Sequence, residues 1–181
     1  MVTALACWPA AHVLAEQDNP RPRHKVSAGE LHRALSARFP LRFGIPGMVE
    51  MRISAPSLHL RPARNQLGAG LLAEVSGVQA RQSETGEIDV VFALRYERAD
   101  QTVRGHQLEV LDMRLPGLPP DPLRAVQRML PAMAREAVGE VVLHQFTARE
   151  LALPDTMGFE PEQLTVLEDG LLVSFGPKLR R

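Results

Sequence analysis

The feature that most constrains the fold of this chain is a change from helical to alternating hydrophobic periodicity, which begins at Met48. From there to Leu115, apolar residues return at every second position in four successive stretches. Side chains on a β-strand point alternately to the two faces of a sheet, so this period predicts strands that are buried on one face. Because short turns join the stretches, we expect a meander of antiparallel strands. The four strands are expected at residues 48–61, 67–75, 88–96 and 103–115.

Two irregularities in this alternation predict bends in the sheet. Pro56 interrupts the first stretch, after which Leu58 and Leu60 continue in a shifted phase. A proline inside a strand pattern is typical of a sheet edge or a bulge. The last stretch changes phase between Val110 and Leu111. A sheet that bends at both places can curve around another element.

Two amphipathic helices flank the predicted meander. Ser27 and Glu30 have the spacing of a capping box, and Pro40 ends the helical period that follows them. The second helix, at residues 121–138, begins with an N-cap acid that is followed by a proline at the first helical position. Its apolar side chains form one stripe, and Pro131 is expected to kink it.

The C-terminal part of the chain returns to strand patterns. Residues 141–149 are expected to form a strand, and residues 164–166 and 171–175 flank Glu168–Gly170, which is a strong hairpin signal. A Pro- and Gly-rich connection is expected at residues 41–47. Since strands and helices are segregated along the chain, the sequence predicts an antiparallel α+β domain.

Composition and motifs do not favour an enzyme. The 21 basic and 21 acidic side chains cancel, which leaves no net field to attract nucleic acid. Gly68–Ala73 matches the dinucleotide-binding fingerprint, but it lies within a predicted strand and no helix follows it. The sequence contains neither a P-loop nor a Gly-x-Ser-x-Gly elbow. We therefore expect no catalytic residues and no cofactor.

Metal binding is not expected either. The six histidines include no pair at i, i+4 spacing, and there is no HExxH motif. Cys7 is the only cysteine, which excludes an intrachain disulfide and a cysteine-rich zinc site within one chain. His59 and His106 alternate with apolar neighbours, as do the carboxylates Glu87 and Asp89. These polar side chains are therefore expected on the solvent face of the sheet.

The first fifteen residues carry no Lys, Arg, Asp or Glu. This run is too short to cross a bilayer, which needs about 20 residues, but it suits the apolar part of a secretory signal. Ala4–Cys7 resembles a lipobox, and Val13–Ala15 resembles a small-residue cleavage site. Glu16–Lys25, with two prolines, is expected to be an extended tether. We expect signal and tether at 1–25 and a single domain at 26–177; alternatively, the apolar run packs on the domain.

A series of sequence elements resembles the DUF1439, or YceB-like, family of bacterial envelope lipoproteins. The elements are LHRALSARFP (Leu31–Pro40), ISAPSLHLRPARNQL (Ile53–Leu67), VVFALRYERADQTVRGHQLEVLDM (Val90–Met113), GLPPD (Gly117–Asp121) and GLLVSF (Gly170–Phe175). The resemblance implies a fold similar to tubular lipid-binding (TULIP-like) domains, in which a curved antiparallel sheet wraps around a long helix and leaves an apolar cleft. It supplies no catalytic residues. It also implies that Cys7 is lipidated and that the protein is periplasmic and anchored to a membrane.

One functional hypothesis and one alternative follow. We expect a non-enzymatic lipoprotein that binds a lipid or other hydrophobic molecule in a groove between the second helix and the sheet. Burial of apolar surface would drive this binding. The alternative is a structural or adaptor lipoprotein with a filled core, which contacts envelope proteins of unknown identity. Neither hypothesis involves nucleic acid. The expected ligand-lining residues are Met51, Ile53, Leu71, Val75, Phe92, Leu94, Val126, Met129, Leu130 and Met133.

Overall fold

The computed structural model describes residues 21–45, 49–77, 84–116, 120–139 and 141–178. The predicted signal, including Cys7, lies outside these residues. In chain order the elements are β1 (Arg23–Ser27), α1 (Ala28–Ser36), β2 (Leu41–Ile45), β3 (Val49–Arg61), the 3₁₀ turn η1 (Pro62–Arg64), β4 (Gln66–Gly77), β5 (Glu84–Glu97), β6 (Thr102–Arg114), α2 (Pro120–Gly139), β7 (Val142–Gln145), α3 (Ala148–Thr156), β8 (Phe159–Leu167) and β9 (Gly170–Pro177).

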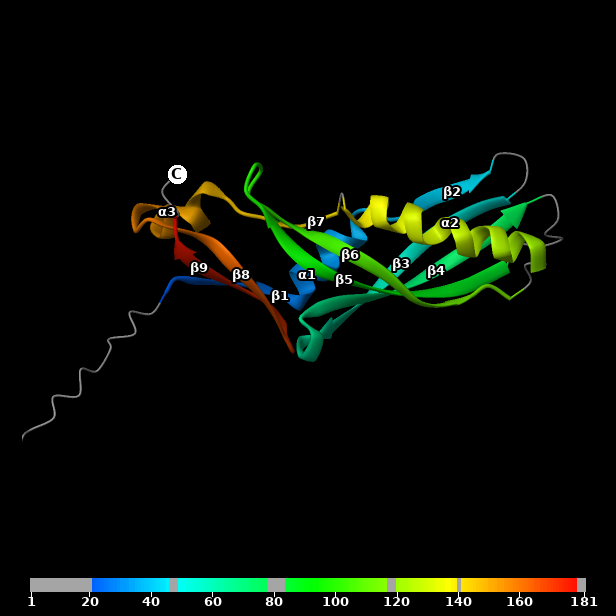
Figure 1. The fold of residues 1–181 in the computed structure, drawn as a ribbon, viewed down its shortest axis with the longest axis horizontal. Coiled ribbons are helices and arrows are strands. Elements are labelled where there is room, and N and C mark those ends of the chain that lie inside the picture. The colour runs from blue at the N-terminus through cyan, green and yellow to red at the C-terminus, as the bar shows by residue number, and fades with distance from the viewer. Residues whose placement is uncertain (1–20, 46–48, 78–83, 117–119, 140, 179–181) are drawn as a thin grey trace, which may run out of the picture.

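The strands form two antiparallel sheets, which confirms the predicted α+β class. The expected long helix enclosed by the sheet is not found among the described residues, because α2 packs mainly on β6. A six-stranded sheet has the order β2-β3-β4-β5-β6-β7 and curls into a half-barrel. A three-stranded sheet has the order β1-β9-β8. Figure 1 shows the three-stranded sheet at one end of the elongated molecule and α2 along the six-stranded sheet at the other. The chain is therefore long in one direction, with two curved layers placed end to end.

Both predicted irregularities of the meander are found in the six-stranded sheet. The pairing of β3 with β4 shifts register between Ser54 and Ser57, on either side of Pro56. The pairing of β5 with β6 shifts where Asp89 opposes Asp112 and the next residue, Val90, opposes Val110. An unpaired residue on one strand bends it and increases its twist. The two shifts lie close together in the sheet, because Ser57 opposes Gly70 and Gly70 opposes Asp89. Both therefore contribute to the curl of the six-stranded sheet.

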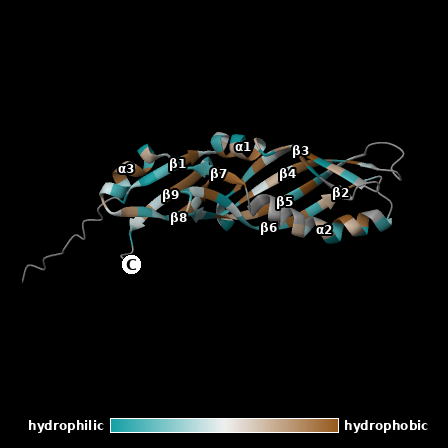
Figure 2. Ribbon diagram, turned by 90° about the horizontal axis from the view of Figure 1, so that it is seen from above, coloured by the Kyte–Doolittle hydropathy of each residue, from teal (hydrophilic) through white to brown (hydrophobic). Residues whose placement is uncertain are grey.

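A single hydrophobic cluster joins the two sheets. Apolar residues of β3, β4 and β5 meet on the inner face of the six-stranded sheet, and residues of β8 and β9 continue the cluster. Helix α1 connects the two parts, because it packs against β3 and β7 of one sheet and β1 and β9 of the other. Its side chains Leu31 and Leu35 are fully buried. Figure 2 shows hydrophobic residues in the strands of both sheets.

Helix α2 runs for 20 residues and contains Pro131. Among the described elements its main packing partner is β6. Leu123 and Val126 pack against the hydrophobic cluster, while Met129 is 43% exposed. None of the helices in the described ranges has the length and apolar character that a bilayer crossing requires.

The N-terminal boundary of the domain differs from the prediction. The sequence predicts residues 23–25 in the tether, yet they form β1 and pair with residues 172–174 of β9. Only Val26 of this strand is buried. An edge strand is held mainly by backbone hydrogen bonds, which leave no hydrophobic period in the sequence. The tether prediction is therefore wrong for residues 23–25.

Two other segments also differ from the prediction. Residues 41–45 belong to the expected connection but form the edge strand β2, paired with β3. Residues 141–149 are expected to form one strand. Instead β7 ends at Gln145 and α3 begins at Ala148, because Thr147 caps the helix.

Candidate functional site

Most of the predicted ligand-lining residues meet on the inner face of the six-stranded sheet. Met51 pairs with Val75 across β3 and β4, and Ile53 lies two positions further on the same face. Phe92 of β5 opposes Leu67. All four predicted residues, Met51, Ile53, Val75 and Phe92, are buried in the hydrophobic cluster. Their burial means that other parts of the protein cover this face.

The remaining predicted residues are less buried. Leu71, Leu94 and Val126 pack against the cluster from its margin. Met129 lies on α2 with 43% of its surface exposed. The side chains of Leu130 and Met133 lie outside what the structure describes. The fold thus brings seven predicted residues into one cluster and leaves Met129 at the solvent boundary.

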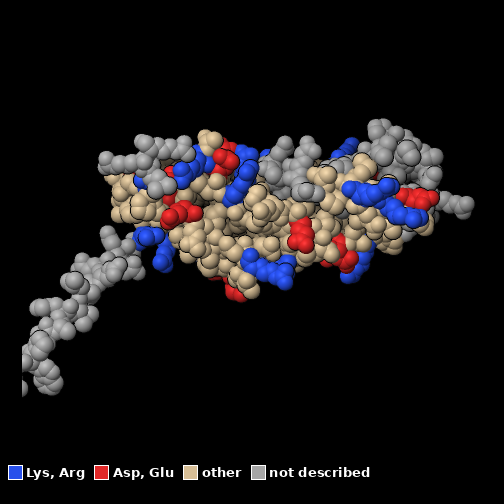
Figure 3. Space-filling view, viewed as in Figure 1, with Lys and Arg blue, Asp and Glu red and all other residues tan. Residues whose placement is uncertain are grey.

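The surface of the described residues carries charges of both signs. Figure 3 shows Lys and Arg interspersed with Asp and Glu on the face in view. His59 and His106 are exposed, as predicted, and so are Glu87 and Asp89. These polar side chains form the outer face of the same strands whose inner face is apolar.

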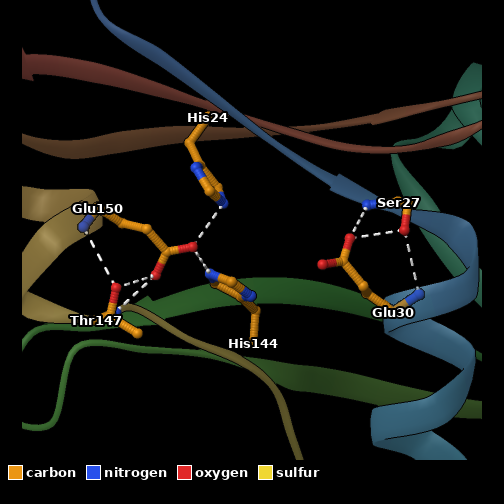
Figure 4. A network of polar contacts seen from close by, with 6 residues as sticks. All are labelled: His24, Ser27, Glu30, His144, Thr147 and Glu150. Carbon is orange, nitrogen blue, oxygen red and sulfur yellow. Dashed lines mark hydrogen bonds and ion pairs between the residues drawn. The ribbon is translucent and has the colours of Figure 1, made fainter.

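A second site lies where the two sheets meet, and the sequence did not predict it. His24 of β1, His144 of β7 and Glu150 of α3 direct their side chains toward one another (Figure 4). Glu150 Oε1 lies 3.2 Å from Nε2 of His24 and 3.7 Å from Nε2 of His144. We call these three residues the His-His-Glu cluster.

The N-cap of α3 fixes the Glu150 carboxylate in this position. The backbone N–H and the hydroxyl of Thr147 donate to Oε2 of Glu150 over 2.7 and 2.8 Å, and the Thr147 hydroxyl accepts from the Glu150 N–H. This is a complete capping box. It occupies one carboxylate oxygen and leaves the other, Oε1, facing the two imidazoles.

Phe146 supports both imidazoles from one side. Its ring centroid is 5.4 Å from that of His24 and 4.7 Å from that of His144, with the rings edge to face. Phe146 is itself buried and contacts Tyr96 and Phe175 in the same manner. Edge-to-face aromatic contacts restrict ring orientation and contribute stability beyond their buried area. The contacts with Phe146 therefore restrict the orientation of both imidazole rings.

The electrostatic setting differs between the members of the cluster. Burial lowers the pKa of His144, although the neighbouring Glu150 carboxylate acts in the opposite direction. Burial acts to raise the pKa of Glu150, but the hydrogen bonds from Thr147 and the two imidazoles outweigh it, so that pKa is lowered. The arrangement therefore favours a neutral His144 beside an ionised Glu150.

Sequence reasoning missed the His-His-Glu cluster because its members come from three elements. No local spacing links His24 to His144, and the predicted tether included His24. One signal was present: Thr147 and Glu150 have capping-box spacing, which predicts a helix start at this point. That signal identifies α3, but it does not reveal the contact between Glu150 and the histidines.

No family model matches this chain, and no curated protein matches it. The resemblance to the YceB-like family therefore rests on the sequence elements quoted above.

Proposed function

We propose that this chain is a non-enzymatic lipoprotein of the bacterial envelope that binds a lipid or other elongated hydrophobic molecule between α2 and the inner face of the six-stranded sheet. The observation that carries this proposal is the position of α2. Its main packing partner is β6, the strand next to the β7 edge, although the apolar inner face extends across β3, β4 and β5.

The inner face supplies the apolar surface that such a ligand needs. Met51, Ile53, Val75 and Phe92 lie together in the hydrophobic cluster, and Leu71 and Leu94 extend the surface toward its margin. Burial of apolar surface is worth about 25 cal/mol per Å². Because the first four of these side chains are already buried, the gain would come mainly from the apolar surface that the acyl chain itself removes from water.

Helix α2 has the properties of a movable cover. Among the described side chains of α2, Leu123 and Val126 pack against the hydrophobic cluster. Met129 of the same helix remains 43% exposed. Because α2 belongs to neither sheet, it can move away from the six-stranded sheet without disrupting strand pairing. The half-exposed Met129 would then pack on the ligand, for which a flexible thioether is well suited.

The envelope part of the proposal rests on the sequence. The charge-free first fifteen residues, the lipobox-like Ala4–Cys7 and the resemblance to YceB-like lipoproteins all support export and lipidation at Cys7. This anchor would hold the ligand-binding domain near a membrane. A single acyl chain binds a bilayer only marginally, so stable anchoring requires the full lipoprotein modification with several chains.

Titration with a fluorescent fatty-acid probe tests the ligand-binding proposal. The variants are Met129→Glu and the matched control Gln127→Glu, which adds the same charge to α2 at another exposed position. We expect saturable binding by the wild type, a loss of at least tenfold in affinity for Met129→Glu, and a change within twofold for Gln127→Glu. Unchanged melting temperatures would show that both variants fold. Absence of saturable binding by the wild type would contradict the proposal.

The adaptor function has its own supporting observation. Leu153 of α3 and Met157, which follows that helix, are 67% and 48% exposed and lie four residues apart at the end of the molecule opposite α2. Exposed apolar side chains that cluster on one surface mark contact sites for proteins. If the wild type binds no hydrophobic probe, the filled core and this surface favour the adaptor function.

A further inference from the structure

We propose that the His-His-Glu cluster is a binding site for one divalent transition-metal ion of the Zn²⁺ type, which links β1 to β7 and α3. The proposal is independent of hydrophobic-ligand binding, because none of the three residues lies on α2 or among the predicted ligand-lining residues.

The donor atoms are of the right kind and nearly at the right separations. The three potential ligand atoms lie within 4.8 Å of one another, and the two distances from Glu150 Oε1 to the histidine Nε2 atoms are 3.2 and 3.7 Å. Ligand atoms that are each about 2.0–2.1 Å from a tetrahedral zinc ion lie about 3.3 Å apart. Small rotations of the two imidazoles therefore suffice to close the site around an ion.

The Glu150 carboxylate is pre-positioned for this role. Thr147 holds Oε2 with two hydrogen bonds, so Oε1 is turned toward both histidines (Figure 4). Such outer hydrogen bonds orient a metal ligand and are a regular part of metal sites. A carboxylate that only capped the helix would need no histidine beside its second oxygen.

Helix α1 provides an internal comparison. Glu30 is held by Ser27 in the same capping box, with its Oε2 accepting from the Ser27 N–H at 2.9 Å and from the hydroxyl at 2.6 Å. The other oxygen of Glu30 faces the His144 side, and the two groups interact electrostatically, but among the described residues no hydrogen bond or ion pair joins Glu30 to His144 (Figure 4). Glu150 therefore differs from Glu30 in having two imidazole nitrogens close to its second oxygen, at 3.2 and 3.7 Å.

His144 gives the second independent observation. Its Nε2 atom is buried and has no hydrogen-bond partner among the described residues. A buried polar atom without a partner costs free energy, so such atoms are rare in folded proteins. An ion bound between Nε2 of His144, Nε2 of His24 and Oε1 of Glu150 would satisfy it.

The ligand set defines the class of ion. Two imidazole nitrogens and one carboxylate oxygen suit Zn²⁺ and its first-row neighbours, whereas Ca²⁺ and Mg²⁺ prefer oxygen ligands throughout. The side chains of His24 and Glu150 are each 26% exposed, and that of His144 is 15% exposed. The site is therefore partly open on the side of His24 and Glu150, where a water molecule could supply a fourth ligand.

Isothermal titration of untagged, EDTA-stripped protein with ZnCl₂ at pH 7.5 tests the site, with the melting temperature recorded with and without the ion. We expect one Zn²⁺ per chain and a higher melting temperature when it binds, because an ion that binds only the folded state stabilises it. Glu150→Gln and His144→Ala should each weaken binding at least tenfold. Glu30→Gln removes the carboxylate of the equivalent helix cap, which acts on His144 through its charge alone, and should weaken binding less than threefold.

The exposed histidine His59 provides the control for surface binding. His59→Asn should leave both stoichiometry and affinity unchanged. If the wild type shows no saturable Zn²⁺ binding, or if His59→Asn abolishes it, the site does not exist. If His144→Ala fails to fold, Glu150→Gln decides the question, since Glu30→Gln reports the combined effect of a lost cap and a lost nearby negative charge. Equal Zn²⁺ affinity of Glu150→Gln and Glu30→Gln would overturn the assignment.

Discussion

Glu150 Oε1 lies 3.2 Å from Nε2 of His24. The first described strand, β1, thus contacts the first turn of α3, a helix in the C-terminal part of the chain. The contact depends on Thr147, which holds the other carboxylate oxygen and thereby sets the direction of Oε1. A local device, the helix cap, thus determines a long-range contact between β1 and α3. In α1 the same device holds Glu30, which interacts with His144 through its charge but forms no ion pair with that histidine among the described residues.

The capping box of α1 should contribute measurably to stability. Ser27→Ala removes the hydroxyl that accepts from the Glu30 N–H and donates to its carboxylate. Loss of an N-cap side chain costs about 0.5–2 kcal/mol. Urea unfolding at pH 7 should therefore show a lower midpoint for Ser27→Ala, whereas Ser76→Ala, at an exposed position of β4, should leave it unchanged. An unchanged midpoint for Ser27→Ala would show that the cap is energetically silent.

The effect of Ser27→Ala should depend on pH. The hydrogen bonds from the Ser27 hydroxyl and backbone hold the pKa of Glu30 below its ordinary value of 4.5. A carboxyl with a lowered folded pKa stabilises the protein above its unfolded pKa, and this contribution is lost as pH falls through the folded pKa. The stability difference between wild type and Ser27→Ala should therefore shrink in acid. A difference that grows below pH 4 would contradict this account.

Asn65 should be a critical connection between the two sheets. It adopts a left-handed conformation with φ 51° after η1, accepts from the Val166 N–H at 2.7 Å, and donates to the Leu164 carbonyl at 2.9 Å. Asn65→Gly preserves the backbone conformation but leaves the part-buried Val166 N–H unpaired, which costs about 1–3 kcal/mol. Chemical denaturation measures this loss.

A turn residue of similar conformation controls for the backbone at position 65. Gln101 is exposed and also has a positive φ, 57°. Gln101→Gly should be neutral or slightly stabilising, because glycine removes the side-chain penalty of that conformation. If both glycine variants behaved alike, the hydrogen bonds of Asn65 to β8 would carry no energy.

Gly170 should tolerate no side chain, because β1 approaches it closely. A Cβ at this position would lie 2.2 Å from the Val26 carbonyl oxygen. Gly170→Ala should therefore separate β1 from β9, destabilise the protein by about 1–3 kcal/mol, and speed hydrogen exchange of the β1 amides. At Gly158, where φ is +76°, a Cβ would meet no described atom within 4 Å. Gly158→Ala therefore incurs only the conformational penalty and should leave β1 protected.

Much of the six-stranded sheet could be predicted from the sequence, because alternation reports which side chains share a buried face. Pro56 and the phase change at Val110 even located two register shifts. The division into two sheets could not be predicted, since periodicity says nothing about which strand lies beside which. The strand β1 pairs with β9 and has only one buried side chain, so no hydrophobic pattern marks it.

The candidate sites follow the same rule. The apolar residues of the inner face were predictable, because burial on a strand leaves a period in the sequence. The His-His-Glu cluster could not be predicted, because its residues lie on β1, β7 and α3, which meet only in the folded protein. Its one local trace is the spacing of Thr147 and Glu150.

Photoaffinity labelling with a diazirine-bearing fatty acid, followed by peptide mapping, tests the proposed hydrophobic-ligand site most directly. The account predicts labelling within α2 and on β3 or β4, and loss of that labelling when unlabelled fatty acid is added in excess. Labelling confined to α3 around Leu153 and Met157, or labelling that excess fatty acid does not reduce, would contradict binding between α2 and the sheet.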